Sequence, residues 1–304
     1  MLAEIFYWVL NMSITAIFTG MIVLLLRQIK KIPRRFIYYI WVIPFFRMML
    51  PLGLSSRFSF MSLLSGITTK TIEVFKLSGD VSFSMMNSVR LADTYFPITY
   101  KSAGVQKIFQ VASGIWIVVA LALLFMLIAL YRLTMKEMKD AVPLRDNIFL
   151  SEKIQSPAVY GIIKPRIILP TSYENKNIDY ILMHEKMHIR RGDNLFRMLV
   201  FFIVAVHWFN PLAWVFINKF LGDVEVSCDE CVIAKCNETQ IKEYALSLLE
   251  CKEKNNLFVS AFGGAKIRTR IENIVSFRKM TFFSAIMFLG FFLVVFFILL
   301  TNAK

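Results

Sequence analysis

Three stretches of this sequence run for more than 20 residues without a charged side chain or a proline, and they constrain the fold more than any other feature. They are residues 5–26, 108–131 and 281–301. As a helix rising 1.5 Å per residue, each is long enough to cross the roughly 30 Å hydrocarbon core of a bilayer. Residues 36–52 are a weaker candidate because Pro44, Arg47 and Pro51 interrupt them. We therefore predict a mainly α-helical, polytopic membrane protein with about four transmembrane helices.

The distribution of basic residues predicts the side of the membrane that each loop faces. Residues 27–35 hold five Lys and Arg in one short loop, whereas residues 53–105 spread five over a longer segment that also carries three acidic residues. Short loops rich in Lys and Arg stay in the cytoplasm. Both chain termini then lie outside. The chain divides into a three-span region with an extracellular segment at 53–105 (1–133), a cytoplasmic unit (134–280), and a last span with a short extracellular tail (281–304).

Composition agrees with a location in the cell membrane. Hydrophobic residues make up 57% of the chain, and the mean hydropathy is +0.59. The formal net charge of +14 would also suit a nucleic-acid partner. Because the bases stand beside the predicted spans, anionic lipid headgroups explain them better. We expect the lipid bilayer as a partner and no direct nucleic-acid binding.

The segment ILMHEKMHIRRGDN, residues 181–194, contains two of the three histidines of the chain. His184 and His188 are four residues apart, so both imidazoles lie on one face of a helix predicted over residues 180–191. They can then bind one Zn²⁺ while Glu185 stays free to act on the water as a general base. The motif is short, and taken alone it also fits a polar patch on an ordinary helix.

A hydrolytic zinc site needs a third protein ligand, and its position depends on residues 195–221. Residues 198–218 carry no charge, but Asn210 and Pro211 interrupt them, and each remaining piece is short for a span. We predict a re-entrant helical hairpin over residues 195–221 that returns the chain to the cytoplasmic face, sheltered by protein at its turn. If this stretch crossed the membrane instead, the residues after it could not reach His184.

Glu225 and Asp229 follow the hairpin and are four residues apart, so they share one face of a helix. Glu225 can supply the third metal ligand. Asp229 can accept a hydrogen bond from the distal N–H of a ligand histidine and fix its tautomer. The alternative is a solvated acidic face that includes Glu225, Asp229 and Glu230.

Segments rich in β-branched and apolar residues, separated by prolines, precede the histidine motif. They are residues 147–150, 156–163 and 166–169. They predict a small β-sheet in the cytoplasmic unit, either a packing platform or an edge that holds an extended substrate. An amphipathic helix is predicted over residues 239–254 and is expected to pack on the same unit.

Other reactive side chains receive structural explanations. Cys228, Cys231, Cys236 and Cys251 are expected to be reduced packing residues rather than a redox or zinc motif. His207 is interpreted as a polar hairpin tip or pore-lining group rather than a ligand. Asp193, with the two arginines before it, is assigned to anchoring the histidine helix at the lipid headgroups. Arg47 lies inside a predicted span and needs a partner that the sequence does not reveal.

Several blocks of this sequence together resemble the BlaR/MecR family of integral-membrane zinc metallopeptidases, the β-lactam sensor-transducers. The blocks are YGIIKPRIILP, LMHEKMHIRRGD, HWFNPLAW, DVEVSCDECVI and RTRIENIV, in this order. The resemblance covers nearly all of the chain. It implies His184, His188 and Glu225 as zinc ligands, Glu185 as general base and Asp229 as the residue that orients a ligand. It also implies cleavage of a cytoplasmic protein such as a transcriptional repressor, or of the protease itself, in antibiotic- or envelope-stress signalling.

The sequence departs from that family in one respect and leaves two other functions open. Full sensors of the family carry a penicillin-binding domain beyond the last span, whereas this sequence stops at TNAK. We therefore expect no β-lactam acylation by this polypeptide, and a separate sensor subunit on residues 53–105 remains open. A catalytically silent signalling or scaffold protein is the alternative function. A transporter with a broken helix fits Asn210 and Pro211 but predicts internal repeats, which the sequence does not show.

Overall fold

The computed structural model describes residues 2–29, 31–50, 103–154, 156–173, 178–250, 267–277 and 282–300. It is mainly helical, as predicted. The helices are α1 (Leu2–Gln28), α2 (Arg34–Ile40), α3 (Val42–Met49), α5 (Ala103–Glu137), α6 (Asp179–Arg191), α7 (Asp193–Val206), α8 (Pro211–Ile233), α9 (Glu238–Glu250), α11 (Ile267–Ser276) and α12 (Phe282–Leu300), with short 3-10 turns at Met138–Asp140 and Thr171–Tyr173. Most of the predicted extracellular segment 53–105, Cys251 and the tail after residue 300 lie outside the described residues.

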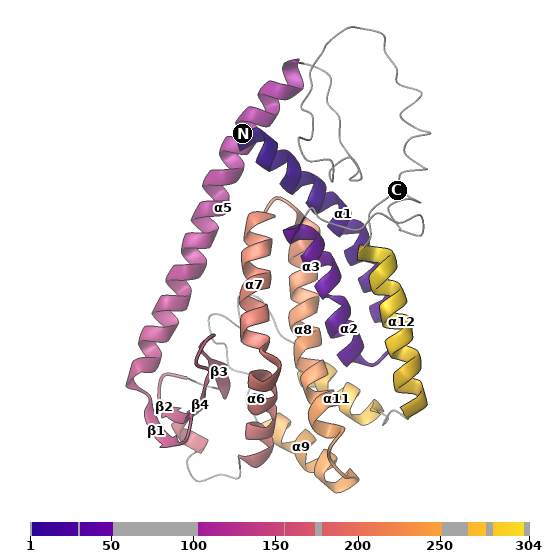
Figure 1. Cartoon of the computed structure of the whole chain (residues 1–304). Helices are drawn as coiled ribbons and strands as arrows, with labels where there is room; N and C mark the ends of the chain where they lie inside the picture. Colours follow the sequence, from indigo (N-terminus) through magenta and orange to yellow (C-terminus); the bar gives the residue numbers. More distant parts are fainter. Residues whose placement is uncertain are drawn as a thin grey trace.

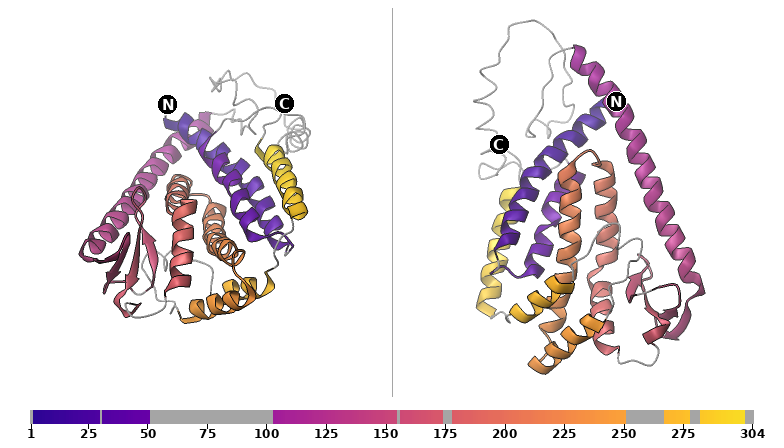
Figure 2. Two further views of the ribbon diagram at one scale, coloured as in Figure 1. Left: turned by 60° about the horizontal axis from the view of Figure 1, so that its bottom comes forward. Right: turned by 180° about the vertical axis from the view of Figure 1, so that it is seen from behind.

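The long helices form a bundle, and the remaining elements gather at one of its ends. α7 and α8 lie between α5 on one side and α1, α2, α3 and α12 on the other (Figure 1; Figure 2 shows the same order from behind). A core of buried apolar side chains from these helices joins them, with Trp41, Phe216 and Phe220 among the largest. The sheet, α6, α9 and α11 lie at the opposite end from the start of α1. The sheet and the short helices α6, α9 and α11 therefore occupy one end of the bundle, and the start of α1 lies at the other.

Among the described residues, two helices are long and apolar enough to cross a membrane: Leu2–Gln28 and Lys107–Asp140. A shorter apolar helix, Ile286–Leu299, corresponds to the last predicted span. The weak candidate at 36–52 is not one continuous helix, because it breaks at Trp41 into α2 and α3. The break has a physical cause in Pro44, which has no N–H and whose ring clashes with the carbonyl of Ile40, the last residue of α2.

The predicted helical hairpin is present and is longer than residues 195–221. α7 and α8 are joined by residues 207–210, and Asn210 caps α8 by accepting from the backbone N–H of Leu212 at 3.0 Å. Its side-chain amide also donates to Ser13 of α1 at 2.8 Å. His207 does lie at the tip, but it is buried, and its Nε2 donates to the carbonyl of Met48 at 2.9 Å. A pore-lining role for His207 is therefore wrong.

Arg47 has the partner that its position in an apolar segment requires. It is fully buried, and its guanidinium donates through Nε and Nη2 to the carbonyl of Leu299, at 3.1 and 3.0 Å. The last carbonyls of a helix have no partner within that helix, so the end of α12 supplies a ready acceptor. The contact fixes the end of α12 against α3.

The small sheet is confirmed and has one strand more than predicted. Its strands are β1 (Val142–Arg145), β2 (Ile148–Ser151), β3 (Ala158–Tyr160) and β4 (Arg166–Pro170), in the order β1-β2-β4-β3. β2 and β4 are parallel, and the other pairs are antiparallel. β1 was not predicted; it contains Pro143, which an edge strand tolerates. Asn194 at the start of α7 donates to the carbonyls of Val159 and Gly161, at 2.9 and 3.2 Å, and so attaches the sheet to the hairpin.

Two buried acids of α8 bind residues at the end of α1 and at both ends of α2. Asp223 accepts from Nε of Arg27 at 2.9 Å and from Nε1 of Trp41 at 2.9 Å. Glu230 accepts from the backbone N–H groups of Arg34 and Arg35, at 3.0 and 3.1 Å, which are orphan donors at the start of α2. The acidic residues of α8 are therefore interior groups, and a solvated acidic face that includes Glu230 is wrong.

Candidate metal centre

The two histidines of the motif face each other on α6. This helix covers the predicted residues, and Gly192 ends it in the left-handed conformation at φ 67°. His184, Glu185 and His188 are all buried. The Nε2 atoms of the two imidazoles are 3.0 Å apart. The spacing of four residues therefore does place both rings on one face, pointing at the same space.

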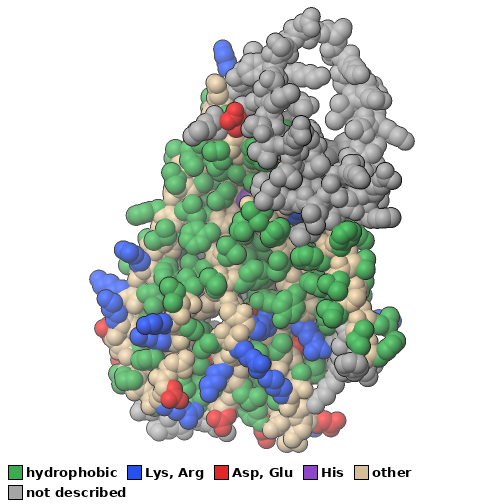
Figure 3. Space-filling model, viewed as in Figure 1, with side chains coloured by type: hydrophobic (Ala, Val, Ile, Leu, Met, Phe, Trp, Pro, Cys, Tyr) green, Lys and Arg blue, Asp and Glu red, His purple; other side chains and the backbone are tan. Residues whose placement is uncertain are grey.

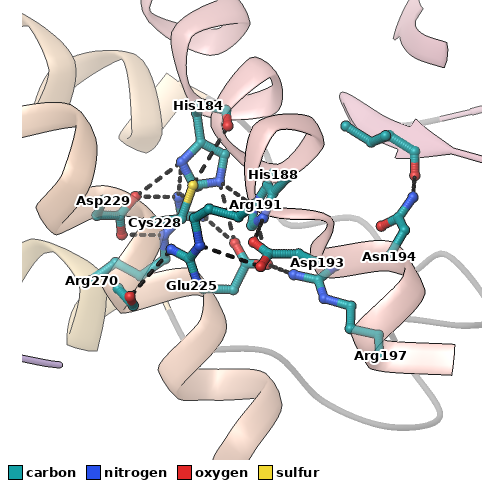
Figure 4. A network of polar contacts seen from close by, with 12 residues as sticks. His184, His188, Arg191, Asp193, Asn194, Arg197, Glu225, Cys228, Asp229 and Arg270 are labelled. Atoms are coloured by element: carbon teal, nitrogen blue, oxygen red, sulfur yellow. Dashed lines mark hydrogen bonds and ion pairs between the residues drawn. The ribbon is translucent and has the colours of Figure 1, made fainter. Parts of the chain in front are cut away.

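Glu225 approaches that space from α8 (Figure 4). One carboxylate oxygen lies 3.4 Å from Nε2 of His184, and the other lies 3.7 Å from Nε2 of His188. In a tetrahedral zinc site with Zn–N bonds of about 2.0–2.1 Å, neighbouring ligand atoms are roughly 3.3 Å apart. Two imidazoles and a carboxylate are also a donor set that zinc accepts in hydrolytic sites. The three side chains therefore fit a single Zn²⁺.

A thiol that the sequence suggested as a packing residue lies at the same place. Cys228 is one turn after Glu225 and is fully buried. Its sulfur and the ring nitrogens of His184 and His188 all lie within 4.8 Å of one another. The thiol donates to the backbone carbonyl of His184 at 3.5 Å. The structure thus brings a fourth donor to the candidate centre, which its spacing from the histidines gave no means to predict.

Asp229 lies where we predicted an orienting residue. Its Oδ1 is 3.2 Å from Nδ1 of His184. The hydroxyl of Tyr244 from α9 lies between them, 2.9 Å from Nδ1 and donating to the same Oδ1. Arg270 of α11 donates to both oxygens of Asp229, at 2.8 and 2.7 Å. A proton held on Nδ1 by these acceptors leaves Nε2 of His184 with its lone pair directed at the candidate centre.

The corresponding partner of His188 is Asp193, for which the sequence suggested a place at the headgroups. Its Oδ2 is 2.6 Å from Nδ1 of His188, and its Oδ1 accepts from the hydroxyl of Tyr38 at 2.8 Å. Arg191 lies over the ring of Tyr38, 4.1 Å from the centroid, and 3.3 Å from Oδ1 of Asp193. Headgroup anchoring by Asp193 is therefore wrong, because this side chain is fully buried against the histidine.

Burial and charge act in opposite directions on the two acids of the centre. Burial alone would raise the pKa of the Glu225 carboxyl, but the charge of His188 and hydrogen bonds from both imidazoles hold that pKa well below its usual range. Burial is outweighed in the same way at Asp229, chiefly by Arg270, so the pKa of this carboxyl is lowered too. Both groups are therefore carboxylates at neutral pH, as a cation site requires.

Glu185 is available for chemistry. It is buried on α6 next to His184, and within the described part of the chain its side chain makes no hydrogen bond or ion pair.

Two arginines that the sequence did not single out complete the surroundings. Arg197 forms an ion pair with Glu225, and Nη2 of Arg270 lies 3.3 Å from Nε2 of His184. The centre therefore combines convergent metal donors and two nearby arginines.

Replacing Asp193 with Asn is expected to weaken zinc binding by roughly 10–100-fold, the usual effect of losing an outer carboxylate partner of a ligand histidine. The amide keeps the shape but not the charge that makes His188 a stronger donor. Competition with a fluorescent zinc chelator measures this affinity. Asp146→Asn, in an exposed turn, is the matched control and should bind zinc normally. Equal affinities for the two variants would contradict the role of Asp193.

Comparison with known proteins supports a metallopeptidase centre. The sequence model of the family described as BlaR1 peptidase M56 matches residues 7–274. A methicillin resistance mecR1 protein of Staphylococcus aureus is 29% identical over 145 residues, which is 44% of this chain and 25% of that protein. A regulatory protein BlaR1 of Bacillus licheniformis is 29% identical over 158 residues, 46% of this chain and 25% of that protein. The matched part thus spans about a quarter of these relatives.

Proposed function

Because the chain belongs to the BlaR1 peptidase M56 family, we propose that it is a membrane-embedded zinc metalloendopeptidase. It cleaves a cytoplasmic protein, namely a transcriptional repressor, or itself, or both, and the cleavage serves antibiotic- or envelope-stress signalling. The names of the relatives, a resistance protein and a regulatory protein, support the signalling role. One observation carries the proposal: Nε2 of His184, Nε2 of His188 and the carboxylate of Glu225 converge on one space. Glu185 directly follows His184 on the same helix.

The proposed topology puts this centre on the cytoplasmic side of the cell membrane and both termini outside. The face in Figure 3 supports it, because hydrophobic side chains cover the upper part and Lys and Arg gather below them. Met48 and the hairpin tip lie together at the apolar end, whereas Arg27 and Arg34 lie beside the α8 acids at the other end. The hairpin therefore returns Glu225 to the same end of the bundle as His184. The basic loop at that end, residues 27–35, favours a cytoplasmic location for this end.

In the proposed mechanism, His184, His188 and Glu225 would hold a Zn²⁺, which would supply Lewis-acid chemistry: polarisation of the peptide carbonyl and a lower pKa of water. Glu185 accepts the proton of the attacking water and passes it to the leaving amine. Asp229 with Tyr244 holds the ring of His184, and Asp193 holds the ring of His188, so neither imidazole needs to reorient during the reaction. Burial of the centre keeps bulk water away from these charges.

Removal of the metal tests the proposal even while the substrate is unidentified. Purified chain is incubated with cytoplasmic extract, and new fragments are identified by mass spectrometry. Treatment with a zinc chelator is expected to abolish at least one fragment, and added Zn²⁺, but not Mg²⁺, should restore it. A chain carrying His188→Ala is the control and should yield no such fragment in any condition. Fragments that persist unchanged after zinc has been removed would overturn the metallopeptidase assignment.

A further inference from the structure

A cleft of about 770 Å³ lies between the end of α5 and the sheet, and its lining is basic. Five of its lining residues are cationic: Arg132, Lys136, Lys139, Lys164 and Arg166; among the side chains that the structure describes, no Asp or Glu lines it. The volume is in the range of sites that hold small molecules, roughly 300–1,000 Å³. Like charges gathered in one cleft repel one another, so the cleft is complementary to an anion.

The cations of the cleft are not committed to carboxylates of the described chain. Arg132, Lys136, Lys139 and Lys164 are exposed and form no ion pair with a described residue, while Arg166 lies over the ring of Phe149, 5.0 Å from its centroid. By contrast, the nearby Lys153, outside the cleft, is paired with Asp140. Several free donors therefore face the cleft, as an anionic group with several oxygens requires.

The same cleft has an apolar side that continues along α5. Met135, Met138 and Phe149 line it. Further up α5, towards its start, exposed apolar side chains include Phe125 and Leu121. An occupant that satisfies both parts has an anionic head at the basic residues and an apolar tail along α5.

We propose that this cleft binds an anionic phospholipid of the inner leaflet, with its phosphate among the five basic residues and an acyl chain against α5. The inference rests on the membrane placement of α5 proposed above, which puts the cleft at the level of the cytoplasmic headgroups. Negative lipids at that surface attract juxtamembrane Lys and Arg. A soluble anion would satisfy the cations but would leave the apolar side uncovered.

The sheet side of the cleft is joined to the start of α7. Gly161 lines the cleft, and its carbonyl accepts from Asn194, which follows Asp193 directly. The turn after Gly161 admits no side chain there, because φ is +93° and a Cβ would lie 2.7 Å from the carbonyl oxygen of Lys164. The turn at Gly161 therefore connects the cleft, through Asn194, to Asp193, the residue that contacts His188.

The test uses the full chain in nanodiscs that contain phosphatidylglycerol and phosphatidylcholine with the same acyl chains. After extraction into detergent, native mass spectrometry counts the lipids that stay bound to each protein molecule. The cleft variant carries Arg132→Gln, Lys136→Gln and Lys139→Gln. The matched control carries Lys219→Gln, Lys235→Gln and Lys242→Gln, which remove the same charge from exposed positions outside the cleft.

We expect wild type and control to retain phosphatidylglycerol in preference to phosphatidylcholine, and the cleft variant to lose this preference by about tenfold. Equal retention by the cleft variant and the control would overturn the proposal, as would displacement of the lipid by inorganic phosphate alone. Zinc content is measured in the same samples. Wild type that lacks zinc but binds the lipid selectively would refute the proposed peptidase while leaving the lipid site standing.

Discussion

Replacing Glu185 with Gln is expected to leave zinc bound and to slow cleavage by roughly 10²–10⁴-fold, the range that a positioned general base contributes. Gln has nearly the same size as Glu, so the buried position beside His184 is still filled. It cannot accept the proton of the attacking water. The measurement compares the fragments that wild type and variant produce from cytoplasmic extract, together with their zinc-to-protein ratios.

Glu238→Gln at the exposed start of α9 is the matched control and should cleave like wild type. Two outcomes would contradict the assignment in different ways. A Glu185→Gln variant that cleaves at the wild-type rate would show that another group is the base. A wild type that holds zinc and produces no fragment that depends on Glu185 would favour the catalytically silent signalling protein.

Replacing Glu225 with Gln is expected to lower zinc affinity by more than the roughly 10–100-fold that losing an outer partner costs, because it removes a ligand. The carboxylate oxygens lie 3.4 and 3.7 Å from the two Nε2 atoms, so its charge is the nearest one available to a cation between them. A neutral amide oxygen is a poor substitute. Without that charge, Arg197 also loses its ion-pair partner beside the metal.

Zinc competition with a chelator measures this loss, and Glu243→Gln is the control, because that acid is exposed on α9 and its hydrogen bond within the described chain is to the partly buried Tyr180. Cys228→Ser adds a second comparison. If Glu225→Gln keeps full affinity while Cys228→Ser loses it, the third ligand is the thiol rather than the carboxylate. That result would correct the donor set and leave the two histidines in place.

The sequence predicted best where a local pattern decides the structure. His184 and His188 share a helix face because four residues make about one turn, and this holds in any helix. Asn210 and Pro211 predicted the hairpin turn because proline cannot continue the first helix but suits the start of the second. Pro44 already marked residues 36–52 as a weaker span, and in the structure this segment breaks into two helices at Trp41.

The role of Asp193 could have been predicted only in part. Gly192 signals the end of the histidine helix, and its left-handed conformation turns the chain so that Asp193 returns to His188. Whether the carboxylate faces that ring or the headgroups depends on Tyr38 and Arg191, and Tyr38 comes from a helix more than 150 residues earlier in the sequence. Asp193 was therefore misassigned because Tyr38, one of the partners that hold it inside, is remote in the sequence.

By itself, the sequence determined the helical character, the two-histidine face, the hairpin and most of the small sheet, because each follows from the period and turn chemistry of neighbouring residues. The tertiary structure alone decided that Tyr244, Arg270 and Cys228 surround His184, and that the acids of α8 are interior. These contacts join α6, α8, α9 and α11. They arise from the way those helices pack, and the spacing along one segment carries no information about them.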